Sequence, residues 1–369
     1  MPHIELKNVS KAYGRVQAID RVNLEIADGE YLTMLGPSGC GKTTTLRAIA
    51  GLIQPDEGEI LFDGKNIIDL PPDERDIGMV FQHFEIFPFM DIWDNVTYAP
   101  RVKGKPESQL EELGVNALKL IGMLPRANNF PEDLSAPELQ KIGIARAIAT
   151  ESKLLLLDEP LGALDLKIRM EFQHELRKLV KKLGLTAIHV THDQIEAMNI
   201  SDRIAIMRKG HIHQVDTPMN LYYKPNSIFV CNFLSNSNFL ECFVDHRETG
   251  SSTLRLRGFG PKVKVLIDKW DRMRRLVLAI RKNEISIASE LSPDINTLNA
   301  TIIKRHFLGS KTIFQLRLEN NDRIEAEVLT REITKDIKGL NEQIIISFDE
   351  SDAMCFEYPK DLDYELALE

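Results

Sequence analysis

The sequence of 369 residues predicts two domains: an α/β domain over residues 1–235, with a mostly parallel sheet between helices, and a β-rich, barrel-like domain over residues 236–369. Three observations support this division. The chain exceeds the roughly 100–200 residues of one ordinary domain. Short leucine-rich or β-branched runs alternate with helix-like segments up to about Asn226. After about Leu234 the pattern changes to short segments in which polar and apolar residues alternate.

The first domain contains three apolar runs that predict buried strands of a parallel sheet: Tyr31–Leu35, Leu154–Leu157 and Thr186–Val190. Between the last two, apolar residues recur at helical spacing while the other face carries Lys and Glu, which predicts an amphipathic helix. The apolar positions of this helix are Ile168, Phe172, Leu176, Leu179 and Leu183.

The second domain contains alternating segments that predict half-buried strands, at Leu254–Arg257, Val263–Val265 and Thr312–Leu318. Turn residues separate them at positions 258–261 and 320–322. Many short strands with such turns are typical of a barrel, and we expect an OB-like fold.

The composition excludes some functions. The formal charge of −9 and the pI near 5.6 argue against a nucleic-acid partner, because binding phosphates needs a basic face. No run of about 18 apolar residues is present, and the first ten residues lack the pattern of a signal peptide. We therefore expect any membrane association to come through partner subunits. The four cysteines lack CxxC spacing and predict reduced thiols rather than disulfides or a zinc site: Cys40, Cys231, Cys242 and Cys355.

Residues 36–43, the phosphate loop, read Gly-Pro-Ser-Gly-Cys-Gly-Lys-Thr and match the phosphate-binding pattern GxxxxGK[ST]. The loop follows a predicted strand and precedes a predicted helix, Thr44–Ala50, as that pattern requires. Glycines let successive N–H groups face anionic oxygens, and the helix amino terminus adds its dipole. We expect Lys42 to reach the β- and γ-phosphates of ATP and Thr43 to bind Mg²⁺. The alternative, a glycine-rich turn with an incidental Lys-Thr, would need the flanking strand and helix to be coincidental. The expected nucleotide contacts here are Ser38, Gly39, Cys40, Gly41, Lys42, Thr43 and Thr44.

Two carboxylates follow the predicted strand Leu154–Leu157, at the sheet edge where open α/β folds bind ligands. We expect Asp158 to hold Mg²⁺ through water and Glu159 to orient or deprotonate the attacking water. Two acids at a strand end are alone weak support, because they also occur as helix caps or in solvated turns. Together with the phosphate loop they predict an ATP-hydrolysing site.

With these motifs in this order, residues 1–235 resemble the nucleotide-binding domain of ABC transporters, with a helical subdomain at about 84–150. The resemblance implies that Tyr13 stacks on adenine, although a tyrosine before a glycine is otherwise more often a packing residue. It implies that Gln82 senses Mg²⁺ and the attacking water, and that His192 is the switch histidine that contacts the γ-phosphate. It also implies that residues 162–165, Gly-Ala-Leu-Asp, meet an opposite ATPase subunit across a dimer. We call these four residues the dimer loop.

An apolar stretch from His83 to Val96 follows Gln82. In the family the corresponding surface receives a coupling helix of the permease, and exposed aromatic patches commonly mark such contacts. Packing inside the helical subdomain is an equally weighted alternative.

The sequence departs from the family at the signature segment, Leu134–Glu138. The family has Leu-Ser-Gly-Gly-Gln there, and its Ser and N–H groups bind the γ-phosphate held by the opposite subunit; this chain has Leu-Ser-Ala-Pro-Glu. Pro137 has no N–H, and Glu138 adds a negative charge where a phosphate should lie. Read locally, Ser135 as N-cap with Glu138 closing a capping box is a good helix start. We expect the helix to form and Ser135 to be a weakened phosphate ligand, so the working complex should pair this chain with a second ATPase whose signature is intact.

The stretches 161–167 and 191–197 and the β-rich tail resemble importers of sugars, polyamines and ferric or other oxyanion-type cargo, whose tail is regulatory. The resemblance implies an ATPase that converts ATP and water to ADP and phosphate at the cytoplasmic face of the membrane. Its partners would be two permease subunits and, through them, an extracytoplasmic solute-binding protein. Cargo is left open among sugar, polyol and polyamine, with a slight preference for polyamine from residues 278–284 and 344–348. The alternatives are a soluble non-transport ABC ATPase and a homodimeric importer ATPase for polyamine or ferric ion.

Overall fold

The computed structural model describes residues 3–82, 85–162, 164–258, 260–267, 269–271, 273–288, 296–333 and 339–368. The chain divides into two compact units, residues 1–224 and 225–368. This division precedes the predicted boundary at residue 235, because helix α8 (Ile228–Ser235) contacts strand β14 (Arg275–Arg281) and helix α9 (Leu362–Leu366) of the second unit.

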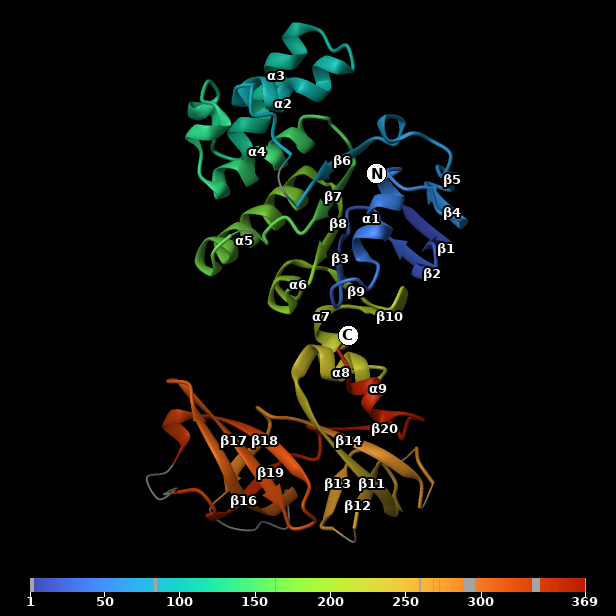
Figure 1. Ribbon diagram of the computed structural model, residues 1–369, viewed down its shortest axis with the longest axis vertical. Coiled ribbons are helices and arrows are strands. Elements are labelled where there is room, and N and C mark those ends of the chain that lie inside the picture. Colours follow the sequence, from blue (N-terminus) through green and yellow to red (C-terminus); the bar gives the residue numbers. More distant parts are fainter. Residues whose placement is uncertain are drawn as a thin grey trace. The chain divides into compact units, whose positions relative to one another are not determined.

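A six-stranded sheet forms the centre of the first unit, in the order β10-β9-β3-β8-β7-β6 (Figure 1). All neighbours pair in parallel except β10 with β9, which confirms the mostly parallel sheet. Its strands are β3 (Tyr31–Leu35), β6 (Ile77–Val80), β7 (Leu154–Asp158), β8 (Thr186–Thr191), β9 (Arg203–Arg208) and β10 (His211–Asp216). Every residue of β3, β7 and β8 is buried, because helices cover both faces of such a sheet.

Strands β3, β7, β8 and β10 are followed along the chain by α1 (Lys42–Ala50), α5 (Leu166–Leu183), α6 (Gln194–Ile200) and α7 (Pro218–Tyr223), respectively. Helix α1 begins two residues before its predicted start, directly at the phosphate-loop lysine. Helix α5 buries Phe172, Leu176 and Val180 against β7 and β8, which confirms the predicted amphipathic helix. Strands β3, β7 and β8 therefore end at one edge, and the loops after them lie side by side.

A second, antiparallel sheet of the first unit has the order β2-β1-β4-β5. Its strands are β1 (Ile4–Tyr13), β2 (Val16–Ile26), β4 (Glu57–Phe62) and β5 (Lys65–Asn66). Residues Ile4, Ile19 and Ile60 of this sheet share one apolar core with Leu46 and Ile49 of α1. The helix that carries the phosphate loop is thus packed between the two sheets.

Three helices form the helical subdomain, close to β6 (Figure 1): α2 (Ile92–Val102), α3 (Glu107–Leu120) and α4 (Ala136–Ile148). They share an apolar core that includes Ile92, Val96, Leu118 and Ile142. No helix within the described ranges is both long enough and apolar enough to cross a membrane.

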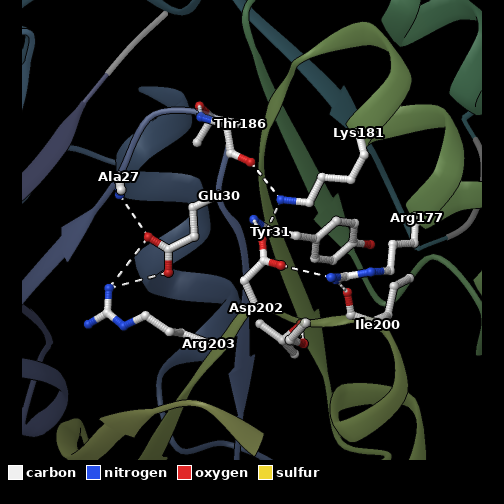
Figure 2. A network of polar contacts seen from close by, with 12 residues as sticks. Ala27, Glu30, Tyr31, Arg177, Lys181, Thr186, Ile200, Asp202 and Arg203 are labelled. Atoms are coloured by element: carbon white, nitrogen blue, oxygen red, sulfur yellow. Dashed lines mark hydrogen bonds and ion pairs between the residues drawn. The ribbon is translucent and has the colours of Figure 1, made fainter.

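A network of ion pairs ties α5 to the amino-terminal edge of the central sheet (Figure 2). Asp202 accepts hydrogen bonds from the Tyr31 backbone N–H and from the side chains of Arg177 and Lys181. Burial raises the pKa of Asp202, but these hydrogen bonds outweigh it and leave that pKa below its ordinary value. The far end of α5 is therefore fixed at the edge opposite the phosphate loop.

The second unit contains two five-stranded antiparallel sheets, in the orders β13-β12-β11-β14-β20 and β15-β19-β16-β17-β18. Their further strands are β11 (Ser237–Glu248), β12 (Ser251–Leu256), β13 (Lys262–Val265), β15 (Ser286–Ala288), β16 (Asn296–Phe307), β17 (Lys311–Leu318), β18 (Arg323–Leu329), β19 (Gln343–Phe348) and β20 (Ala353–Glu357). Both sheets contribute to one apolar core, as Leu278 and Phe314 illustrate. The three strands predicted in this part of the chain correspond to β12, β13 and β17, which confirms the β-rich tail.

Candidate functional site

The phosphate loop joins β3 to α1 and depends on its glycines. Gly39 and Gly41 have φ of 75° and 107°, in the left-handed region that side chains disfavour. A Cβ at Gly41 would overlap the carbonyl of Ala18, and one at Gly36 the carbonyl of Met207. The loop thus fits closely against neighbouring backbone while leaving Ser38 and Gly39 exposed.

Lys42 is buried inside this loop. Its Nζ donates hydrogen bonds to the carbonyl oxygens of Gly36 and Pro37, each at 2.8 Å, and lies 3.7 Å from Sγ of Cys40. The ammonium group is therefore held within the loop by these carbonyl oxygens, and it can exchange them as hydrogen-bond partners for the oxygens of a bound phosphate. Burial raises the pKa of the Cys40 thiol, which keeps it protonated beside the lysine.

Thr43 and Asp158 form an oxygen pair at the base of the loop. Oγ1 of Thr43 donates to Oδ1 of Asp158 at 2.9 Å, and Asp158 is only 2% exposed. Burial raises the pKa of Asp158, although the Thr43 hydrogen bond and Arg47, 3.9 Å away, oppose this shift. A buried carboxylate next to a hydroxyl suits a hard divalent cation such as Mg²⁺. Among the described residues no three His, Cys, Asp or Glu side chains form a metal cluster.

Glu159 lies between the two other residues predicted to be catalytic. Its Oε2 accepts a hydrogen bond from Nε2 of Gln82 at 3.0 Å, and its Oε1 lies 3.3 Å from Nδ1 of His192. Gln82 follows β6, Glu159 follows β7 and His192 follows β8, so the sheet order brings the three together. Glu159 has φ of 46°, an uncommon backbone conformation that is often found at functional sites.

Tyr13 ends β1 and is 49% exposed, and Nζ of Lys11 lies 5.8 Å from its ring centre. This exposure is contrary to a packing role and leaves a ring face open for stacking.

Ser135 is held by its own helix. Oε2 of Glu138 accepts hydrogen bonds from the Ser135 N–H at 2.9 Å and from its Oγ at 2.7 Å. These bonds from Ser135 keep the pKa of Glu138 below its ordinary value, so the carboxylate is charged. The predicted helix start is confirmed, with Ser135 as N-cap of α4. The Ser135 carbonyl also accepts a hydrogen bond from the Leu139 N–H at 2.9 Å, and within the described residues no hydrogen bond of Ser135 reaches the phosphate loop.

The apolar stretch after Gln82 divides between core and surface. Ile92 and Val96 are fully buried in the helical subdomain, whereas Phe89 is 73% exposed. The rings of Phe87 and Tyr98 lie 4.7 Å apart. The stretch is therefore partly core and partly exposed surface, and contact with a permease helix stays a prediction; His83 and Phe84 lie outside the described residues.

A row of buried polar contacts that ends at Thr191, next to His192, was not predicted from the sequence. Oη of Tyr31 lies 2.9 Å from Nδ1 of His189, whose Nε2 lies 3.0 Å from Oε1 of Glu196. Oε2 of Glu196 accepts a hydrogen bond from Oγ1 of Thr191 at 2.8 Å. A histidine inside an otherwise apolar strand is the one sequence signal for this chain of contacts.

The chain is similar to known ATP-binding proteins of transporters. Residues 19–162 match the family model described as ABC transporter. The spermidine/putrescine import ATP-binding protein PotA of Pseudomonas aeruginosa strain UCBPP-PA14 is 37% identical over 326 residues, covering 88% of this chain and 90% of that protein. The protein of the same name from Clostridioides difficile strain 630 is 47% identical over 238 residues, covering 64% and 69%. A solved dimeric structure of the ATP-binding cassette MJ0796, in a post-hydrolysis state bound to ADP and Pi, is 34% identical with a TM-score of 0.53 and covers 58% of this chain and 98% of that one.

Proposed function

Because this chain belongs to the ATP-binding subunits of ABC importers, we propose that the site around Glu159 hydrolyses ATP between two nucleotide-binding domains to drive solute uptake. Family membership itself makes the chain an ATPase coupled to transport, with ATP and Mg²⁺ as cofactors and membrane permeases as partners. It acts as a peripheral protein at the cytoplasmic face of the membrane.

Each site residue has a role in this proposal. The phosphate loop binds the phosphates through backbone N–H groups and Lys42, with Tyr13 against the adenine. Thr43, Asp158 and Gln82 would hold Mg²⁺, which neutralises charge on the β- and γ-phosphates. Glu159 orients a water and takes its proton as the water oxygen bonds to the γ-phosphorus and the bond to the bridging oxygen breaks, releasing ADP. His192 contacts the γ-phosphate and positions it.

The observation that carries the proposal is the position of Glu159, with Gln82 at 3.0 Å and His192 at 3.3 Å on either side. The test is Glu159→Gln, which should keep nucleotide affinity, stop turnover and trap a closed dimer. Glu151→Gln is the matched control, because Glu151 is an exposed glutamate that also has a positive φ, 57°. Normal hydrolysis by the Glu159 variant would refute the assignment of the base.

The working ATPase is, in this proposal, a heterodimer. Each ATP site combines one subunit's phosphate loop with the other's signature, so a homodimer of this chain would contain two weakened sites and a heterodimer one sound site. The support is the Ser135 hydroxyl, which is bonded to Glu138 rather than free for phosphate. The assay compares phosphate release by the chain alone and with a second ATPase subunit. Brisk, cooperative turnover by the lone chain would favour the homodimer.

We propose a polyamine as cargo, because two relatives are named for spermidine and putrescine import. Sugars and polyols remain the other candidates, since cargo is bound by the permease and the solute-binding protein rather than by this subunit. Exposed Phe89, which follows Gln82 by seven residues in the sequence, is the proposed contact with a permease helix. Reconstitution with the permeases and uptake of labelled spermidine, against maltose and glycerol, tests the cargo. Failure to co-purify with any integral membrane subunit would favour a soluble ATPase.

A further inference from the structure

Helix α5 carries two arginines that make similar contacts at opposite edges of the central sheet. Near its start, Arg169 donates from Nη1 to Oδ2 of Asp193 at 3.0 Å and from Nη2 to the carbonyl of Leu164 at 2.9 Å. Two turns later, Arg177 bonds in the same way to the Asp202 carboxylate and the Ile200 carbonyl (Figure 2). Only the Arg169 contacts lie on the nucleotide side.

The two groups that Arg169 joins belong to different loops of the proposed site. Leu164 lies in the dimer loop, of which Ala163 lies outside the described residues. The first residue of this loop, Gly162, donates a hydrogen bond from its N–H to the Glu159 carbonyl at 3.2 Å. Asp193 directly follows His192. A guanidinium group is rigid and planar, so two bonds to it fix the distance between its partners.

His192 depends on its neighbours for orientation. Its own side chain is 59% exposed, and its Nδ1 lies 3.3 Å from Oε1 of Glu159. By contrast, the Asp193 N–H donates to Oγ1 of Thr191 at 3.0 Å, and Oδ1 of Asp193 accepts from the Glu196 N–H at 3.0 Å. The backbone on both sides of His192 is therefore fixed. Arg169 connects this segment to the dimer loop, because it bonds both to the Asp193 carboxylate and to the Leu164 carbonyl.

We propose that Arg169 is a positioning residue that transmits movement of the dimer loop to His192, so that turnover depends on contact with the second ATPase domain. This inference rests on the proposed roles of His192 and the dimer loop. Arg169 itself need not touch the nucleotide. Its removal should leave ATP affinity unchanged and lower the rate of hydrolysis.

The experiment uses the full chain, alone and with its ATPase partner, and compares Arg169→Ala, Arg169→Lys and Arg177→Ala. Loss of one charge-assisted contact corresponds to a decrease of about ten- to hundredfold in rate. We therefore expect kcat of Arg169→Ala to fall at least about tenfold, while KM stays within about twofold of the wild-type value. Arg169→Lys keeps a positive charge for the ion pair but lacks the two-armed guanidinium group that joins both partners. Its kcat should therefore lie between that of Arg169→Ala and that of the wild type. Arg177→Ala should lower the thermal midpoint while keeping kcat. Equal effects of the two alanine variants on kcat would overturn the proposal, because the role of Arg169 would then be structural.

A double-mutant cycle tests whether Arg169 acts through His192. In the His192→Ala background, the Arg169→Ala change should have little further effect, because the two losses are not independent. Multiplicative losses would refute transmission through His192. If the wild-type complex shows no ATPase activity, or His192→Ala alone is fully active, the proposed function fails and this inference fails with it. A wild-type complex that is active and needs His192 but not Arg169 overturns this inference alone.

Discussion

Restoring the family sequence in the signature segment should increase hydrolysis by this chain alone. The first perturbation is Glu138→Gln, which keeps an oxygen that can accept the Ser135 N–H but removes the charge. The second adds Ala136→Gly and Pro137→Gly, so that the segment reads as in the family and regains a backbone N–H at position 137.

The magnitude follows from the contacts of Ser135. Before its hydroxyl can bind a phosphate of the opposite subunit, it must leave Oε2 of Glu138 at 2.7 Å, a charge-assisted bond of about 1.5–3 kcal/mol. This corresponds to about ten- to hundredfold in rate. The side chain of Glu138 is 29% exposed, so its repulsion of phosphate adds no more than about 1 kcal/mol. We expect about tenfold faster turnover for Glu138→Gln and a larger gain for the triple variant.

The assay is steady-state phosphate release at increasing concentrations of the lone chain, with Glu159→Gln in the same background as the blank. Glu111→Gln, an exposed position on α3, controls for the loss of one negative charge. The triple variant should lose about 1 kcal/mol of stability, because glycines replace residues in the first turn of α4. If it is folded and binds MgATP but turns over no faster than wild type, the signature segment is not what limits the lone chain.

Three further changes test the site and its support. Because burial raises the pKa of Asp158, the native state binds its proton more tightly than the unfolded chain does, and the resulting stability is lost as pH rises through the folded pKa. Asp158→Asn should therefore raise the thermal midpoint of the nucleotide-free chain at pH 8 and abolish the increase in that midpoint on adding MgATP. A lower midpoint for the nucleotide-free variant would contradict this reasoning. Arg75 is buried and donates hydrogen bonds to the carbonyls of Ala48 and Ile49 at the end of α1. Arg75→Met should therefore lower the free energy of unfolding, measured in urea, by at least about 3 kcal/mol. A decrease below about 1 kcal/mol would contradict this prediction. His189→Phe breaks the buried chain to Glu196 and should lower kcat more than ATP affinity, whereas equal effects on both would indicate general loosening of the sheet.

The local parts of the fold and site could be predicted because their signals are contiguous in sequence. The phosphate loop and the carboxylates after Leu157 each occupy a few adjacent residues next to an apolar run, so pattern and chemistry identify them together. The helix start at Ser135 is likewise a matter of four residues. The placement of α8 in the second unit could not be predicted in this way, because its partner helix α9 lies at the far end of the chain.

The contacts that position the proposed catalytic groups could not be predicted, because they join residues far apart in sequence. Tyr31 and His189 are separated by 158 positions, and each alone is an ordinary residue of a buried strand. Arg169 lies on an amphipathic helix that carries several other basic residues, and its partner Asp193 is 24 residues away. Only the order of β3, β8 and β7 in the sheet, which side-chain periodicity does not encode, makes these residues neighbours.

The signature segment illustrates how a better helix start can oppose a functional site. Glycines at the first helical positions, as in the family sequence, stabilise a helix less than alanine or proline do, but they leave N–H groups open to phosphate. Here Ala136 and Pro137 favour the helix, and Glu138 satisfies both the N–H and the hydroxyl of Ser135. In our proposal the carboxylate thus takes the place at the helix amino terminus that a phosphate would take in the family. We therefore expect the same two bonds that stabilise α4 to weaken its affinity for nucleotide. Because the phosphate loop, Asp158 and Glu159 keep the family pattern, we expect this loss to affect only the site that the opposite subunit's nucleotide would occupy.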